Sequence, residues 1–139
     1  MKECNRIIGE RIAEFRMQGE LPIRFRVDLS KTIAPQRACG IQVVPADARE
    51  KAKLTLLRDR LAVEIFRYHA EDHATFGFHI SLAYQMSPFS DEERRRYQRM
   101  LELHISKIIA AAPVIELGDP EFCTFNDMYR FDVQTLLRT

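Results

Sequence analysis

Hydrophobic residues recur at intervals of three and four in three segments of the chain, which is the pattern of an amphipathic helix. The segments are residues 4–18, 47–68 and 90–112. The two later ones begin with Asp47 and Ser90, each followed three residues later by a glutamate, which is the spacing of a capping box. The pattern therefore predicts an N-terminal helix followed by two long helices.

Other segments either alternate apolar and polar residues or are rich in aromatic and branched residues, as β-strands are. The predicted strands cover residues 23–29, 40–45, 76–84, 114–117 and 129–137. The first two are expected to pair as an antiparallel hairpin around a loop. The stretch that precedes the last strand, residues 118–128, is predicted to be a long turn. Three apolar residues of this turn, Phe122, Phe125 and Met128, are expected in the core together with Phe131 of the last strand.

Helices and strands are mixed along the chain, without repeats, low-complexity tracts or flexible linkers. This order predicts an α+β fold in which two long helices pack on an antiparallel sheet. A length of 139 residues allows one domain with a core of its own. Within it we separate an N-terminal helical part, residues 1–22, from the remainder, residues 23–139.

Composition narrows the functional classes. The chain has 21 Lys and Arg against 20 Asp and Glu, a net charge of +1, so no nucleic-acid or membrane partner is required by charge. The cysteines, Cys4, Cys39 and Cys123, are odd in number and far apart, which argues against a disulfide framework and a zinc site. No apolar run reaches the roughly 20 residues of a membrane span. We therefore expect a cytoplasmic protein without a metal or other cofactor.

The tripeptide His-Ile-Ser occurs twice, at 79–81 and at 104–106. Side chains alternate along a strand, so His79 and Ser81 share one face of the predicted strand. Their neighbours on that face, Gly77 and Ala83, are small and leave a trough beside them. A histidine moves protons near neutral pH and a hydroxyl holds a phosphoryl oxygen. The alternative is a histidine and a serine satisfied on a solvated or helix-covered sheet face.

The other histidines are weaker candidates. On a helix each residue turns by about 100°, so His104 and Ser106 point about 200° apart and cannot hold one phosphate. His104 is expected to be a partly buried core residue. His73 and Thr75 share the face of His79 only if the strand extends back to them, and otherwise His73 is a loop residue. With Tyr84, they are the candidate rim of the site.

A run of three arginines offers one further candidate. Arg94, Arg95 and Arg96 follow three acidic residues in the third helix. We interpret them as a charged solvent face, with an RNA-binding patch as the alternative.

The stretch "GFHISLAY", residues 77–84, resembles the His-x-Ser/Thr motif of the two-histidine (2H) phosphoesterase superfamily. With the preceding helix and the segment "FCTFNDM", it is more closely similar to an uncharacterised bacterial branch, a domain of unknown function. The resemblance covers roughly residues 23–135. It implies two similar α+β lobes around a cleft, each giving one motif. It also implies hydrolysis of cyclic phosphates or RNA-type phosphodiesters, with histidines as general acid and base, hydroxyls on the phosphoryl oxygens, and no metal.

By this resemblance His79 and Ser81 would form one half of the site. The other motif stands several tens of residues upstream in the family, but residues 1–70 contain no His-x-Ser/Thr, and their one histidine is His69. The expectation is therefore a C-terminal part of the fold, with residues 1–22 as a remnant of the first lobe. Either the protein is longer, or this form has lost half of the site.

Three functional hypotheses follow. The first is a phosphodiesterase-like domain whose substrate is a phosphate ester, a cyclic nucleotide or an RNA end, and which is incomplete in this chain. The second is a module that binds phosphate or nucleotide without turnover, and the third is a structural domain. A homodimer through the face left by the missing lobe would bring two copies of His79 together.

Overall fold

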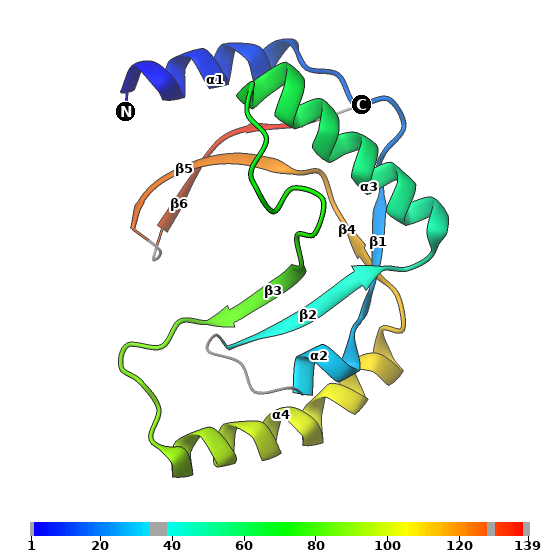
Figure 1. Cartoon of the computed structure of the whole chain (residues 1–139), viewed down its shortest axis with the longest axis vertical. Helices are drawn as coiled ribbons and strands as arrows, with labels where there is room; N and C mark the ends of the chain where they lie inside the picture. Colours follow the sequence, from blue (N-terminus) through cyan, green and yellow to red (C-terminus); the bar gives the residue numbers. More distant parts are fainter. Residues whose placement is uncertain (1, 34–38, 128–129, 138–139) are drawn as a thin grey trace. The chain divides into compact units, whose positions relative to one another are not determined.

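The computed structural model describes residues 2–33, 39–127 and 130–137. They form two compact units, each described by itself. Unit 1 comprises Met1–Ile23, Asp47–Ala74 and Glu116–Thr139, and unit 2 comprises Arg24–Ala46 and Thr75–Ile115. The predicted fold class is confirmed, because the protein is a mixed α+β structure of antiparallel strands with helices packed on them (Figure 1).

The helices and strands follow one another in a mixed order. In chain order they are α1 (Lys2–Glu14), β1 (Ile23–Val27), α2 (Leu29–Ile33), β2 (Cys39–Pro45), α3 (Ala48–Arg60), the π-helical continuation η1 (Leu61–Phe66), β3 (Phe78–Ala83), α4 (Asp91–Ala111), β4 (Ile115–Leu117), β5 (Glu121–Asp127) and β6 (Arg130–Leu136). None of the helices described is long and apolar enough to cross a membrane.

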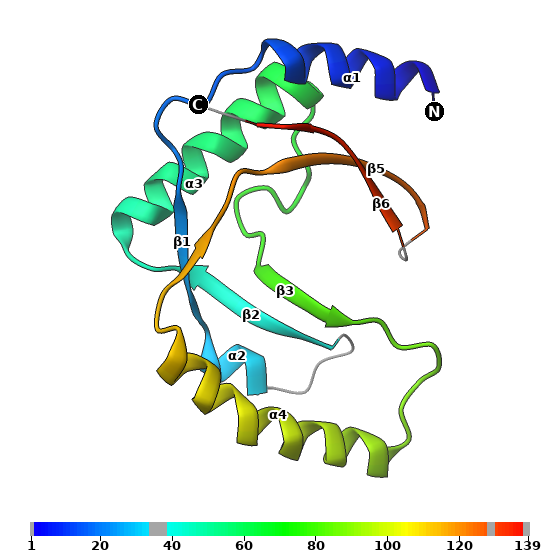
Figure 2. The same cartoon turned by 180° about the vertical axis from the view of Figure 1, so that it is seen from behind.

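Unit 2 is built on the strands β1, β2 and β3. The four-stranded sheet has the order β3-β2-β1-β4, so β2 lies between β1 and β3 (Figure 2). Both of its pairings, with β1 and with β3, are antiparallel, which confirms the predicted hairpin of β1 and β2. One face of these strands is apolar, and Phe25, Ile41 and Val43 are buried on it. Phe25 meets the half-buried Phe78 there across β2, with ring centroids 5.6 Å apart.

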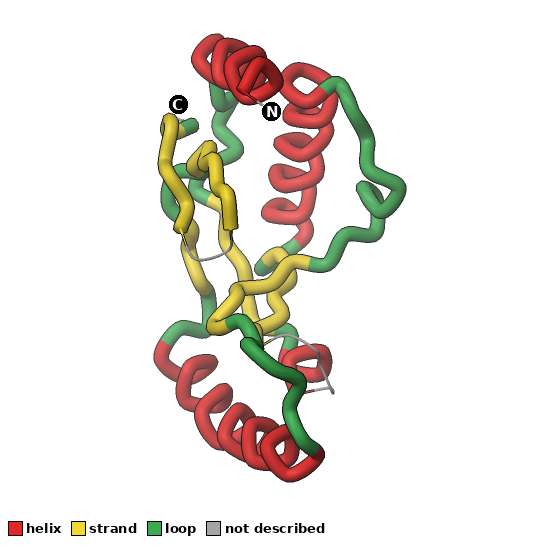
Figure 3. Tube along the Cα trace, turned by 90° about the vertical axis from the view of Figure 1, so that its left-hand side faces the viewer, coloured by secondary structure: helices red, strands yellow, loops and turns green. Residues whose placement is uncertain are grey.

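Two helices complete unit 2. The short helix α2 and the long helix α4 lie on the same side of the strands (Figure 3). Leu101 and Ile105 of α4 are buried, and a complete capping box of Ser90 and Glu93 begins the helix, as predicted. The carbonyl of Ile33 in α2 accepts a hydrogen bond from the side chain of Gln98 in α4. The predicted loop between β1 and β2 thus contains a helix, and its residues 34–38 lie outside the described part.

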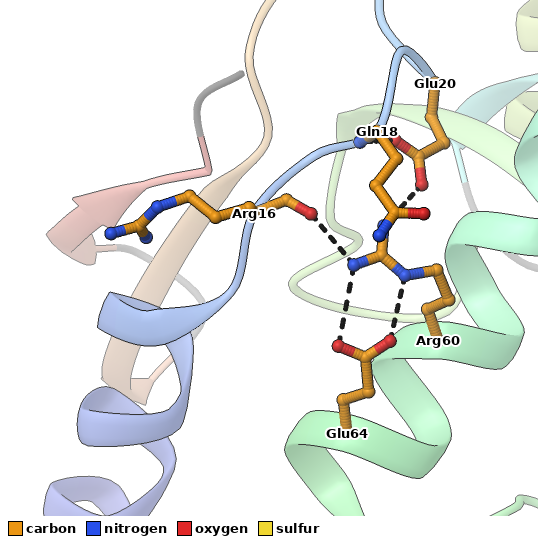
Figure 4. Close-up of polar contacts among 5 residues, drawn as sticks. All are labelled: Arg16, Gln18, Glu20, Arg60 and Glu64. Atoms are coloured by element: carbon orange, nitrogen blue, oxygen red, sulfur yellow. Dashed lines mark hydrogen bonds and ion pairs between the residues drawn. The ribbon is translucent and has the colours of Figure 1, made fainter.

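Unit 1 packs α1 against η1 and against the hairpin of β5 and β6. Its core is formed by Ile12, Phe15, Leu54, Leu57, Ile65 and Leu137. A polar cluster centred on Arg60 joins the end of α3 to the segment after α1 (Figure 4). The guanidinium of Arg60 contacts the carboxylates of Glu20 and Glu64 at 2.6 and 2.9 Å, and it donates to the carbonyl of Arg16.

The prediction of a long turn at residues 118–128 was wrong, because most of this segment is the strand β5. Register shifts against β6 follow Phe122 and Thr124, and they break the strict alternation that identifies a strand from sequence. The expected core role also fails for Phe125 and Phe131, which pack on each other but stay about half exposed, at 54% and 48%. Phe122 is half-buried, and Met128 lies outside the described residues.

Three further expectations need correction. The first helix ends at Glu14 rather than near residue 18, although Phe15 and Met17 beyond it are buried. The apolar face of β3, opposite His79, is expected from its sequence to belong to the core, but it is only partly buried, because β3 is the edge strand of its sheet and leaves Leu82 55% exposed. His104 is exposed rather than partly buried, since the buried stripe of α4 passes through Leu101 and Ile105.

Candidate functional site

The candidate site is centred on His79 and Ser81, both on the edge strand β3. The strand alternates as predicted, so the two side chains point to the same face, and both are exposed. The other face carries Phe78 and Ile80, which are half-buried. Within the described part of the chain, neither the imidazole of His79 nor the hydroxyl of Ser81 has a hydrogen-bond partner. Both groups are therefore available to a ligand.

The neighbouring strand β2 comes close to the backbone of these two residues. Gly40 lies opposite Ser81 and Gln42 lies opposite His79, and residues opposite each other in an antiparallel pair share a face. Gly40 stands at a register shift, where a Cβ would lie 3.0 Å from the carbonyl oxygen of Ile80. Gly77, before the strand, has nothing within 4 Å of where its Cβ would be. Open space thus adjoins Gly77, whereas at Gly40 the backbone of Ile80 already stands where a side chain would be.

The third strand adds positive charge to the same face. Arg26 of β1 lies opposite Val44 of β2, and Val44 is two residues from Gln42, so Arg26 and His79 project from one side of the sheet. Arg24 lies two residues further along β1, and both arginines are exposed. The sequence prediction missed them. The alternation of residues 23–27 placed both opposite Phe25, but it gave no sign of which strands lie beside β1.

His73 belongs to a different environment from His79. It lies in the turn at residues 71–75, in unit 1, and its Nε2 is 2.7 Å from Oδ1 of Asp59 in α3. Its ring meets the ring of His69 edge-on, at a centroid distance of 4.8 Å. A cavity of about 250 Å³ lies beside it, lined by Arg58, Leu61, Ala62, Phe66, Tyr68, Ala70 and His73. His73 is therefore a turn residue held by a carboxylate, and β3 does not extend back to it.

The remaining predicted residues surround β3 or lie on α4. Thr75 and Tyr84 lie outside β3, before its first residue and directly after its last, and both are exposed. His104 and Ser106 are exposed on α4, where the helical turn separates them as predicted. The arginines at positions 94–96 are exposed in the first turns of that helix, as expected of a solvent face.

The chemistry available on the β3 face is proton transfer and oxyanion binding. An imidazole accepts or donates a proton near neutral pH, a hydroxyl donates to a phosphoryl oxygen, and a guanidinium forms paired hydrogen bonds to phosphate. No group of three or more His, Cys, Asp or Glu side chains among the described residues is placed to hold a metal ion. The face therefore carries groups of the kind that bind an oxyanion and exchange a proton.

Comparison with known proteins supports the fold and leaves the function open. The chain is similar to the crystal structure of ATU0111, a conserved protein of unknown function from Agrobacterium tumefaciens strain C58. The TM-score is 0.78 at 29% sequence identity, over 98% of this chain and 55% of that chain. The chain thus spans about half the length of ATU0111. No protein-family model matches the sequence, and no curated protein matches it.

Proposed function

We propose that the polar face of β3 binds the phosphoryl group of a phosphate ester, and that His79 transfers a proton during hydrolysis of that ester. The observation that carries the proposal is the shared exposed face of His79 and Ser81, with Gly40 opposite Ser81. The substrate class, cyclic phosphates or RNA-type phosphodiesters, is the one implied by the resemblance of residues 77–84 to the 2H superfamily.

Hydrolysis of a cyclic phosphodiester fixes the role of each group. Water attacks phosphorus, one ring P–O bond breaks, and the proton lost by water is balanced by the proton gained by the released hydroxyl. The imidazole of His79 either takes the proton from water or gives one to the released hydroxyl, and the hydroxyl of Ser81 donates a hydrogen bond to a phosphoryl oxygen. The second proton-transfer group would come from a second motif in a longer polypeptide or from a second copy of this chain. The greater length of ATU0111 leaves room for such a motif in proteins of this fold.

The proposal is tested with a 2′,3′-cyclic nucleotide and the variant His79→Ala. Loss of a general acid or base lowers the rate by about 10²–10⁴-fold, so turnover should fall by at least about 100-fold. The matched control is His104→Ala, because His104 begins the same tripeptide and is also exposed, but lies on a helix. Turnover by His79→Ala equal to that of the His104→Ala control would falsify the catalytic role.

A module that binds phosphate without turnover is the second candidate. Two-histidine catalysis needs two His-x-Ser/Thr motifs, and among the described residues only His79 and Ser81 form such a pair on a strand. A single motif favours binding without turnover. Titration with a nucleotide, beside the turnover assay, separates the two candidates. Binding without product supports the module, and the absence of both binding and product supports a purely structural domain.

A homodimer would supply a second His79 to the site. β3 is the edge strand of its sheet, and Leu82 and Tyr84 near its end are about half exposed, which leaves a backbone edge and apolar surface for a second copy. Sedimentation equilibrium over a range of concentrations tests this association. Turnover per chain that rises with dimer content supports it, and turnover by a monomer refutes the need for it.

The cysteines bear on where the protein acts. Cys4, Cys39 and Cys123 are all free thiols, as expected of a protein in a reducing compartment, which supports our proposal of a cytoplasmic location. Cell fractionation is the direct test.

A further inference from the structure

We infer that Arg26 completes the phosphoryl site of the β3 face and supplies it with a permanent positive charge. This inference rests on the proposed function, because it assigns a further binding residue to the same site. Nothing in the His-x-Ser pattern itself points to Arg26, which stands 53 positions before His79 in the sequence (79 less 26). Only the pairing of β1 and β3 with the common neighbour β2 brings the two together.

The register places Arg26 diagonally across β2 from His79. Arg26 lies opposite Val44, and His79 lies opposite Gln42. Val44 and Gln42 are two residues apart along β2. From ordinary strand spacing, the Cα atoms of Arg26 and His79 lie about 12 Å apart, two strands across and about two residues along. Over this distance the side chains of a histidine and an extended arginine are long enough to contact one phosphoryl group in the gap between them. Gln42 and Val44 form the floor beneath that gap.

The electrostatics of the proposed reaction call for such a group. The phosphoryl oxygens of a diester carry negative charge, whereas a neutral imidazole and a hydroxyl carry none. The planar guanidinium of arginine matches two phosphoryl oxygens with paired hydrogen bonds and remains charged at any pH of interest. Arg26 is therefore suited to hold the anion while His79 exchanges a proton with it.

Arg26 is also available for this role. Its side chain is exposed, and it has no hydrogen-bond or ion-pair partner within the described part of the chain. Arg24 is the natural comparison, because it stands on the same strand and on the same face. It lies one two-residue step further from His79, about 7 Å along β1, which takes its guanidinium away from the gap.

The test is a titration with inorganic phosphate, followed through the ring resonances of His79 in the NMR spectrum. The variants are Arg26→Gln and, as the matched control, Arg24→Gln, which removes the same charge from the same strand. Charged hydrogen bonds account for roughly a 10- to 100-fold change in affinity, so Arg26→Gln should weaken phosphate binding by that factor. Arg24→Gln should change it by less than about threefold, as expected for a screened charge at greater distance.

Equal binding by Arg26→Gln and the wild type would overturn the inference, and so would an equal loss of binding in both arginine variants. Absence of phosphate binding to the wild type would overturn it as well. Arg26→Lys adds a finer test, because lysine keeps the charge but lacks the paired donors of the guanidinium. This variant should bind phosphate better than Arg26→Gln and less well than the wild type. These readouts need no turnover. If Arg26 proves unnecessary for phosphate binding but His79→Ala still abolishes turnover, the proposed function stands. If turnover is unaffected by His79→Ala, the proposed function itself is wrong.

Discussion

Gly40 and Ile80 come closer to each other than a side chain on Gly40 would allow. A Cβ built at Gly40 would lie 3.0 Å from the carbonyl oxygen of Ile80, directly beside the position of Ser81. Because the obstructing atom belongs to the backbone, it cannot rotate away, and β2 and β3 would have to separate. The glycine therefore couples the pairing of these strands to the geometry of the candidate site.

We predict that Gly40→Ala destabilises the protein by about 1–3 kcal/mol, the usual cost of adding atoms to a packed position. Urea denaturation measures this change. Gly118→Ala is the control, because the added methyl group meets open space there and the free energy of unfolding should hardly change. Equal effects of the two substitutions would show that the close approach to Ile80 has no energetic weight.

Ser81→Ala should weaken binding of phosphate or a cyclic nucleotide without affecting stability. The hydroxyl is exposed and has no partner within the described residues, so its removal costs the fold little, whereas a ligand loses one hydrogen bond. A hydrogen bond to a charged group contributes about 1.5–3 kcal/mol, which corresponds to roughly a 10- to 100-fold loss of affinity. Isothermal titration measures it, with Ser106→Ala of the helical copy as the control. An effect of similar size in the control would remove Ser81 from the site.

Glu20 should carry more of the stability than Glu64, although both contact Arg60. Glu20 is fully buried, whereas the side chain of Glu64 is 46% exposed. Loss of one partner of a buried ion pair costs about 3 kcal/mol or more, and an exposed pair contributes below about 1 kcal/mol. We therefore expect Glu20→Gln to destabilise strongly and Glu64→Gln weakly in chemical denaturation at pH 7. Similar losses in both variants would contradict this ranking.

The contribution of Glu20 should also depend on pH. Burial by itself would raise the pKa of Glu20, but the backbone amides of Glu20 and Gln18 and the guanidinium of Arg60 together lower it below its ordinary value of 4.5. A carboxyl group whose pKa is lower in the folded state stabilises the fold above the unfolded-state pKa, and this stability is lost as pH falls through the folded-state pKa. The difference between wild type and Glu20→Gln should therefore shrink below about pH 4.5. A difference that stays constant down to pH 3 would contradict the assignment.

Tyr97 should make the protein less stable in alkali. Burial raises the pKa of its phenol above the ordinary value of 10.0, and the nearby Cys39 thiol adds to the shift. A group whose pKa is higher in the folded state stabilises the fold below the unfolded-state pKa, and this stability is lost as pH rises through the folded-state pKa. Wild type should therefore lose stability faster than Tyr97→Phe above about pH 10, in denaturation curves recorded side by side. Parallel curves for the two proteins would exclude this role.

The sequence by itself determined the features that depend on neighbouring residues. The capping box of Ser90 and Glu93 begins α4, and the alternation of residues 78–83 places His79 and Ser81 on one face. Both signals are local, because helical hydrogen bonds join residues four apart and side chains in a strand alternate at every step. For the same reason β5 was missed, since its register shifts break the local alternation.

The tertiary structure alone decided which strands lie side by side. Gly40 faces Ser81, and Arg26 shares a face with His79, only because β2 pairs with β3 on one side and with β1 on the other. Such pairings join residues tens of positions apart, and their register is set by the packing of whole faces rather than by any short pattern. The physical reason is that a strand leaves its backbone hydrogen bonds to be made by another strand, whereas a helix makes its own.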